Sequence, residues 1–275
     1  MCVVFVRSCL MPEKLDETSL VFCFKDGMLL INKEKSRNSL PTLREVSEMT
    51  GNRSDWLYLG ERDGIPCCCV NVDEGSTVPD SFEFCDMRPL YSVLGFELWH
   101  LAGYARQIVD WNRNFTYCGR CGRGTSYMKN ERARVCDECG LINYPRISPA
   151  VIVAIVRDGK ILLAQGKRFR LPFYSVLAGF VEPAENLEEC IVREIREEVG
   201  IEIENIRFFS SQPWPFPDSL MIAFFADYKS GEITIDPAEL IDADWFSPDN
   251  LPEIPPAGSV ARKMIDEFIR NYRKE

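Results

Sequence analysis

The chain is poor in histidine, in long apolar runs and in net positive charge. His100 is its one histidine, which excludes histidine-dependent catalytic triads unless His100 itself serves; its helical surroundings favour a structural role. No apolar run approaches the roughly 18 residues that span a bilayer. The segment Met1–Arg7 lacks the charged region and cleavage site of a signal peptide, and the last residues carry no retention signal. We therefore expect a cytoplasmic protein.

Charge and composition limit the partners. The formal net charge is −10, which argues against extended, non-specific nucleic-acid binding, since such binding depends on neutralising phosphates. The simplest interpretation of this charge is solubility. An apolar content of 46% with 11% aromatic residues is typical of a globular protein, and 275 residues suffice for two domains and a small module.

Cysteine is abundant for a chain with no sign of secretion. Of the twelve, four form two CxxC pairs, Cys118 with Cys121 and Cys136 with Cys139, each followed by a glycine. Two such pairs supply the four thiolates of a structural zinc site, and four sulfur ligands close its coordination shell. A redox pair is the alternative for a single CxxC, and the doubled pattern favours zinc. The run Cys67–Cys69 is better explained as small buried side chains than as metal ligands, because neighbours on a strand point to opposite faces.

The segment around these pairs is locally basic. Its three acidic side chains, Glu131, Asp137 and Glu138, are outnumbered by seven basic ones: Arg113, Arg120, Arg123, Lys129, Arg132, Arg134 and Arg146. A solvated face is the preferred interpretation. The alternative is a surface that guides a polyanion such as RNA.

The first part of the chain alternates short apolar runs with polar connections. The pattern predicts a hairpin of strands 20–24 and 28–31 about an Asp-Gly turn, and a short helix over 41–49. It also predicts strands at 56–60 and 66–70 and an amphipathic helix over 92–111. We assign no chemistry to residues 1–90.

The second half begins with a buried strand at 150–156, a turn and a partner strand at 160–164. Further strands are expected at 175–181, 206–209, 221–225 and 244–246, and a closing helix at 259–272. Strands that flank single helices indicate a layered α/β domain.

One predicted helix of this domain gathers carboxylates. Glu194, Glu197 and Glu198 stand at i, i+3 and i+4, so they share one face. Three like charges so close repel one another unless a hard divalent cation binds them. The pattern therefore predicts a magnesium or manganese site for phosphate chemistry.

The flanks of that helix carry the remaining signals. Asn186 and Glu189 fit a capping box, and Gly200 suits a left-handed stop. Leu187, Ile191, Ile195 and Val199 form the apolar stripe that packs on a sheet. Arg193 is placed to pair with Glu185 in the preceding loop.

These residues together resemble the Nudix hydrolase box at every defining position: Gly179, Glu185, Arg193-Glu194, Glu197-Glu198 and Gly200. The resemblance implies a Nudix α/β/α sandwich domain that hydrolyses a nucleoside diphosphate linked to another group. It further implies that Glu194, Glu197 and Glu198 bind magnesium or manganese and that one glutamate assists the activation of water.

The segment Ser211–Ser219 points to the substrate. Three prolines around Trp214 and Phe216 would stiffen a loop that presents aromatic rings for stacking on planar bases; core aromatics in a proline-rich loop are the alternative. The segment and the preceding zinc ribbon resemble the NADH pyrophosphatase branch of the Nudix family. That resemblance implies substrate contacts at Gln212, Pro213, Trp214, Pro215, Phe216, Pro217, Asp218 and Ser219.

The same branch implies further site residues. Glu239 matches an additional metal ligand, and Ala261 matches a backbone contact to the substrate. Tyr144 and Phe180 match aromatic residues at the nicotinamide end, with Tyr144 supplied across a homodimer. We expect an N-terminal α+β domain with a linking helix at 1–110, a zinc ribbon at 111–147 and a Nudix domain at 148–275.

The expected reaction is hydrolysis of the pyrophosphate of NADH or NAD to nicotinamide mononucleotide and AMP. If the 3′ side of the AMP unit stays open, removal of NAD caps from RNA follows. The alternatives are a Nudix enzyme for another dinucleotide, ADP-ribose or a nucleotide sugar, and a zinc-ribbon module that only senses a nucleotide.

Overall fold

The structure is a computed structural model that describes residues 4–34, 39–49, 56–73, 75–167 and 172–272. It divides into two compact units, Met1–Arg146 and Ile147–Glu275, which we treat separately. None of the helices in the described ranges is both long and apolar enough to cross a membrane.

The first unit is built on a six-stranded sheet with strand order β1-β4-β5-β2-β3-β6. Its strands are β1 (Phe5–Arg7), β2 (Leu20–Lys25), β3 (Met28–Asn32), β4 (Leu57–Arg62), β5 (Ile65–Asn71) and β6 (Phe82–Cys85). The predicted hairpin is confirmed as β2 and β3, and the two further predicted strands as β4 and β5.

The helices of this unit differ from expectation in length. The predicted helix over 41–49 is only one turn, α1 (Leu43–Val46), which starts at the capping box of Thr42 and Glu45. The helix predicted over 92–111 is confirmed as α2 (Tyr91–Asn114), with a break in helical geometry at Gly95. His100 packs against Phe96 within α2, their ring centroids 4.1 Å apart, as a structural side chain would.

The cysteine run lies on β5 and is fully buried. Cys68 belongs to the apolar cluster that includes Leu43 and Val46 of α1, and its neighbours Cys67 and Cys69 are equally inaccessible. Burial raises the pKa of Cys68 to about 12, so the thiol stays protonated at neutral pH. The interpretation as small buried side chains fits this placement.

A small three-stranded sheet completes the first unit: β7 (Thr125–Tyr127), β8 (Arg134–Cys136) and β9 (Ile142–Asn143). Arg132, at its hairpin, donates hydrogen bonds of 2.6 and 2.7 Å to the carbonyls of Ser8 and Tyr58. These bonds fasten the small sheet to the large one within the same unit.

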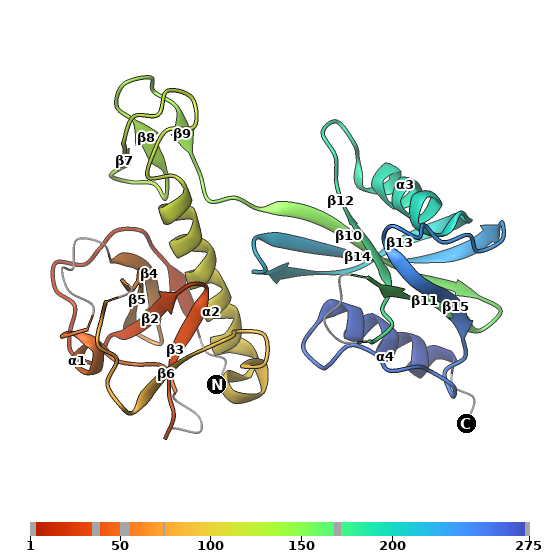
Figure 1. Ribbon diagram of the computed structural model, residues 1–275, viewed down its shortest axis with the longest axis horizontal. Helices are drawn as coiled ribbons and strands as arrows, with labels where there is room; N and C mark the ends of the chain where they lie inside the picture. The colour runs from red at the N-terminus through yellow and green to blue at the C-terminus, as the bar shows by residue number, and fades with distance from the viewer. Residues whose placement is uncertain (1–3, 35–38, 50–55, 74, 168–171, 273–275) are drawn as a thin grey trace. The chain divides into compact units, whose positions relative to one another are not determined.

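The second unit is a sheet between two helices (Figure 1). Its order is β13-β14-β10-β11-β15, with β12 paired to β10. The elements are β10 (Ser148–Arg157), β11 (Lys160–Gly166), β12 (Leu177–Phe180), α3 (Leu187–Val199), β13 (Glu202–Trp214), β14 (Ser219–Ser230), β15 (Leu240–Phe246) and α4 (Val260–Tyr272).

Alternation along β10 explains the two covered faces. Val151 and Val153 pack with Ile191 of α3, whereas Ile152 and Ala154 pack in the cluster that holds Ile265 of α4. Side chains of successive strand residues point to opposite faces, so a strand apolar at every position needs a helix on each side. The expected α/β/α sandwich is confirmed.

The two large sheets share one topology. In the first unit β4-β5 are antiparallel, β5-β2 parallel, and β2-β3 and β3-β6 antiparallel. In the second unit β13-β14, β14-β10, β10-β11 and β11-β15 repeat that sequence of pairings. Apart from β1 and β12, which have no counterparts, the chain order of strands and helices also matches, with α1 where the second unit has α3 and α2 where it has α4. This repeated topology was not predicted from the sequence.

Candidate functional site

Helix α3 begins and ends as the sequence predicts. The Asn186 side chain accepts a 2.9 Å hydrogen bond from the backbone amide of Glu189, and the Glu189 carboxylate accepts one of 3.0 Å from the amide of Asn186. Gly200 ends the helix in the left-handed region, with φ of 71°. The predicted stripe is anchored in the core, where Ile191, Ile195 and Val199 are buried.

Strand β12 brings its backbone against the carboxylate face of α3. A Cβ atom built on Gly179 would lie 1.9 Å from the carboxyl carbon of Glu194, so only glycine leaves room for that side chain. The Glu194 carboxyl group therefore lies against the backbone of strand β12.

Arg193 ties this loop to the helix, as predicted. Its Nε and Nη2 donate to the two oxygens of Glu185 over 2.7 and 2.9 Å, and Nη2 also donates to the carbonyl of Phe180. Its Nη1 donates to Glu194 over 2.8 Å and to Glu197 over 3.1 Å. The bidentate bond lowers the pKa of Glu185 to about 2.

The carboxylates differ in exposure. The Glu197 side chain is 62% exposed and that of Glu194 is 15% exposed, while Glu198 as a residue is 7% exposed. Burial, followed by the charges of Glu194 and Glu239, raises the pKa of Glu198 to about 8. Burial also raises the pKa of Glu194, against the opposing effect of Arg193. Concentrated, partly desolvated negative charge of this kind suits a hard cation.

Glu239 joins the cluster from the segment before β15. It is exposed, and its charge acts on both Glu194 and Glu198. Asp236, three residues earlier, adds to the field at Glu198, and its backbone amide donates to the Glu198 carbonyl over 2.9 Å. Asp236 is not among the site residues predicted from the sequence.

The segment Ser211–Ser219 is less of a loop than predicted. Residues up to Trp214 continue β13 and Ser219 begins β14, so 215–218 alone form the turn of a hairpin. Prolines at the end of an edge strand do not break it, because their missing amides face away from the partner. The rings of Trp214 and Phe216 meet edge to face, with centroids 5.2 Å apart.

The other residues predicted to contact the substrate range from buried to exposed. Within the hairpin, Pro213 and Pro217 are exposed, Asp218 is partly exposed, and Pro215 and Ser219 are buried. Elsewhere, Phe180 is 57% exposed at the end of β12. Ala261 is 7% exposed in the first turn of α4.

Two predicted contacts are engaged with protein groups. Gln212 is 3% exposed, and both ends of its amide bond the backbone beside α4. Tyr144 is 56% exposed, and its hydroxyl donates to Glu131 over 2.8 Å. Tyr144 belongs to the first unit, whereas the other predicted substrate residues belong to the second.

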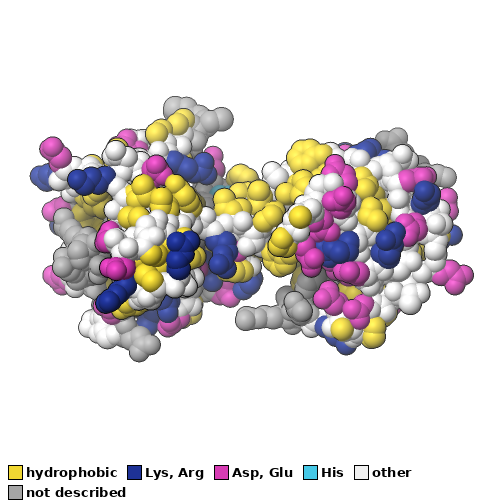
Figure 2. Space-filling view, turned by 90° about the horizontal axis from the view of Figure 1, so that it is seen from above, with side chains coloured by type: hydrophobic (Ala, Val, Ile, Leu, Met, Phe, Trp, Pro, Cys, Tyr) yellow, Lys and Arg dark blue, Asp and Glu magenta, His cyan; other side chains and the backbone are white. Residues whose placement is uncertain are grey.

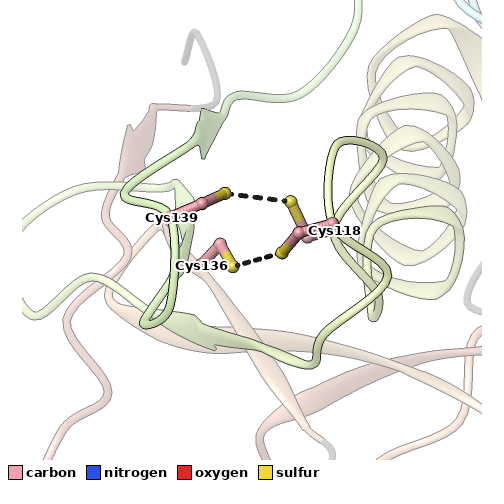
Figure 3. A group of neighbouring side chains, drawn as sticks. Cys118, Cys136 and Cys139 are labelled. Carbon is pink, nitrogen blue, oxygen red and sulfur yellow. Dashed lines mark hydrogen bonds between the residues drawn. The ribbon is translucent and has the colours of Figure 1, made fainter.

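The four cysteines of the two CxxC pairs converge. Their sulfur atoms all lie within 4.8 Å of one another, with 3.6 Å from Cys118 to Cys139 and 3.5 Å from Cys121 to Cys136 (Figure 3). Tetrahedral zinc with Zn–S bonds of about 2.3 Å would separate its sulfurs by about 3.8 Å, so the cluster fits zinc. Hydrogen bonds from the backbone amides of Cys121 and Arg120 lower the pKa of Cys118, which favours its thiolate, whereas the neighbouring thiols raise the pKa of Cys121.

The basic segment is less available than its composition suggests. Arg134 is 7% exposed and bonds both the hydroxyl and the carbonyl of Thr125. The Arg132 guanidinium donates to the carbonyls of Ser8 and Tyr58. Acidic and basic side chains are interspersed on the face in Figure 2. Arg132 and Arg134 therefore have structural roles. The other five basic side chains are exposed, so the solvated face and the polyanion surface both stay predictions: Arg113, Arg120, Arg123, Lys129 and Arg146.

Family models match the chain in three places. Residues 146–268 match a NUDIX domain, residues 113–144 an NADH pyrophosphatase zinc ribbon domain, and residues 18–111 an NADH pyrophosphatase-like rudimentary NUDIX domain.

Curated relatives extend over most of the chain. It is 43% identical over 230 residues to the NAD-capped RNA hydrolase NudC of Escherichia coli O81, which covers 83% of this chain and 85% of the relative. It is 43% identical over 214 residues to the protein of that name from Pseudomonas putida strain F1, covering 77% of this chain and 76% of the relative.

Among solved structures, a NUDIX hydrolase from Nitrosomonas europaea matches with a TM-score of 0.50 at 19% identity. The match covers 57% of this chain and 91% of that one, and it supports the fold.

Proposed function

We propose, from the premise that the chain belongs to the NADH pyrophosphatase branch of the Nudix hydrolases, that it hydrolyses the pyrophosphate of NADH and NAD to nicotinamide mononucleotide and AMP. The observation that carries the proposal is the packing of the Glu194 carboxylate against Gly179, beside Glu198, on a helix fixed at both ends. A carboxylate cluster held in this way suits hard divalent cations, and such cations would in turn bind the charged diphosphate.

The cluster gives each carboxylate a part. Glu194, Glu197, Glu198 and Glu239 would hold magnesium or manganese, which neutralises phosphate charge and lowers the pKa of bound water. Arg193 holds the loop through Glu185 and keeps Glu194 oriented. A glutamate of the cluster accepts the proton of the attacking water, and no covalent intermediate with the protein is needed.

The hairpin supplies recognition. Trp214 and Phe216 offer ring faces to a planar base, a contact worth about 0.5–1.5 kcal/mol beyond the area buried. Phe180 and the backbone of Ala261 are further proposed contacts in the same unit.

We extend the proposal to three finer points. Decapping of NAD-capped RNA, with release of nicotinamide mononucleotide and a 5′-monophosphate left on the RNA, follows if the AMP unit binds with its 3′ oxygen open to solvent, and the relatives named for that activity support it. A homodimer that supplies Tyr144 from the partner is proposed from the family resemblance, as are the three domain boundaries. The cytoplasmic location stays a prediction.

The test is parallel steady-state kinetics on NADH, NAD, ADP-ribose and NAD-capped RNA, with magnesium and then manganese. We expect metal-dependent release of nicotinamide mononucleotide, with the NAD-type substrates preferred to ADP-ribose. Trp214→Ala should lower kcat/KM for NADH by about tenfold, the loss expected for a stacking contact. Unchanged NADH turnover in that variant would favour a different dinucleotide or a nucleotide sugar. A chain that binds nucleotides but hydrolyses none of them would be a sensor.

A further inference from the structure

Gln212 is a buried polar side chain that has no direct role in the proposed hydrolysis. Its Nε2 donates a 2.8 Å hydrogen bond to the carbonyl of Gly258, and its Oε1 accepts one of 2.5 Å from the amide of Val260. A buried amide that loses such partners leaves polar groups unsatisfied, at about 1–3 kcal/mol each. The side chain is therefore held in a single place.

These two bonds join the strand that carries the aromatic hairpin to the start of α4. Gln212 lies opposite Met221 in the β13-β14 ladder, and Trp214 follows two residues later, opposite Ser219. Residues two apart on a strand share a face, so Gln212 and Trp214 both point to the α4 side or both away from it. The bonds of Gln212 identify that face as the α4 side.

At the α4 end, Gln212 supplies an acceptor for one backbone amide, in addition to the local cap at Ser259. The amide of Val260, the first residue of the helix, has no acceptor within the helix itself. Gln212 provides one from another strand, while the Ser259 hydroxyl accepts from the amide of Arg262 over 3.2 Å. The turn before Ala261 is thus located by β13.

We propose that Gln212 is a positioning residue that sets the Trp214 ring against the first turn of α4, where the planar base of the dinucleotide binds. The inference rests on the proposed function and revises the expectation of a direct contact from Gln212. Small displacements of binding groups cost about a hundredfold in rate when they misalign a substrate, so a fixed link between two recognition segments has a kinetic effect.

The first test compares Gln212→Leu, which keeps the size and removes both bonds, with Gln212→Glu, which keeps an acceptor for Val260. For Gln212→Leu we expect a rise in KM for NADH of about tenfold or more, with kcat within about threefold and unchanged Mn²⁺ binding by calorimetry. Gln212→Glu should show a smaller rise. Arg207→Met is the matched control on the same strand, because it breaks the exposed ion pair with Asp227, and its KM should equal that of the unmodified chain.

A double-mutant cycle tests whether Gln212 acts through Trp214. In a Trp214→Ala background, Gln212→Leu should change KM by less than about twofold, since the group it positions is gone. Additive effects, or an unchanged KM in folded Gln212→Leu, would overturn the inference. If Gln212→Leu does not fold, Gln212→Glu carries the same cycle.

Failure of the proposed function has a different signature. A chain that does not hydrolyse NADH refutes the substrate assignment, and the cycle is then run with the nucleotide that it does hydrolyse. If that nucleotide also shows no coupling between Gln212 and Trp214, the positioning role is refuted as well.

Discussion

Two units of this chain carry one strand topology, and one of them has the carboxylate helix. Where the second unit has the thirteen residues of α3, the first has the four of α1. Both helices begin with a capping box, Thr42 with Glu45 in α1 and Asn186 with Glu189 in α3. Only α3 continues for the three turns that place Glu194, Glu197 and Glu198 on one face. We infer that the sheet shared by the two units is a scaffold, and that the reaction depends on the length and side chains of α3.

The comparison also explains the description of residues 18–111 as a rudimentary NUDIX domain. The first unit keeps the pairing order and both helix positions, so the scaffold folds without the site. Its core contains the thiols of Cys67–Cys69, which are fully buried and serve as small packing side chains.

The largest expected effect is on kcat, when one glutamate in each unit is replaced by glutamine and the two variants are compared. Glu198→Gln removes a buried carboxylate from the metal cluster and should lower kcat with Mg²⁺ by about 10²–10⁴-fold, the range of a lost acid–base group. Glu45→Gln, at the third position of the capping box of α1, should leave kcat within twofold and change stability little, because glutamine also serves at that position. Steady-state kinetics and calorimetry on both variants measure the contrast. Equal losses of activity would refute the assignment of the reaction to α3.

The second prediction concerns the close approach of Gly179 to Glu194. Gly179→Ala puts a methyl group where the Glu194 carboxyl now lies, 1.9 Å away, so that flexible side chain must move. We expect about a hundredfold loss of kcat/KM, from misplacement of one ligand, and a small change in melting temperature. A large drop in stability with normal activity per folded molecule would show that the glycine serves packing.

The parts of the fold that local pattern controls were predictable from the sequence. Alternation, turn residues and caps gave the hairpins, α3 and its ends, and the CxxC spacing gave the cysteine cluster. The interpretation was wrong in length for 41–49, because the apolar pattern does not show where a helix ends. After Val46 the chain continues as a turn, in which the Met49 amide donates to the Val46 carbonyl.

The rest depends on contacts between distant residues. Gln212 reads as part of a substrate motif, and its bonds to Gly258 and Val260 cannot be seen in a sequence. In the sequence, Arg132 is one more basic residue of the zinc-ribbon segment. Its hydrogen bond to the carbonyl of Tyr58 joins residues 74 positions apart and is seen only in the structure. The shared topology was missed because pairing order repeats without a repeated motif.

The third prediction contrasts the two sets of thiols in the first unit. Cys136→Ser should abolish zinc binding and lower the melting temperature of this unit, because structural zinc contributes directly to folding. Cys68→Ala, on β5, should keep the zinc and cost only the packing of a small buried side chain. Metal analysis of the purified variants and calorimetry check both outcomes. Loss of zinc from Cys68→Ala would place β5 in the metal site.

The smallest effect is the pH dependence of the ion pair between Glu185 and Arg193, which joins helix α3 to the loop before it. Arg193 lowers the pKa of Glu185 to about 2, so the folded state holds this carboxylate ionised where an unfolded chain, with a pKa near about 4.3, would protonate it. The stabilisation is complete above about pH 5 and is lost as the pH falls through 4 toward 2. The difference in unfolding free energy between the unmodified chain and Glu185→Gln should therefore be constant at neutral pH and shrink below pH 5.

In an Arg193→Met background the same comparison should be nearly independent of pH, because the partner that lowers the pKa of Glu185 is gone. Calorimetry or denaturant titration of the second unit's transition, at pH 7 and at pH 3.5, measures all four variants of this cycle. A difference that grows toward low pH would contradict the ion pair as the source of the stability.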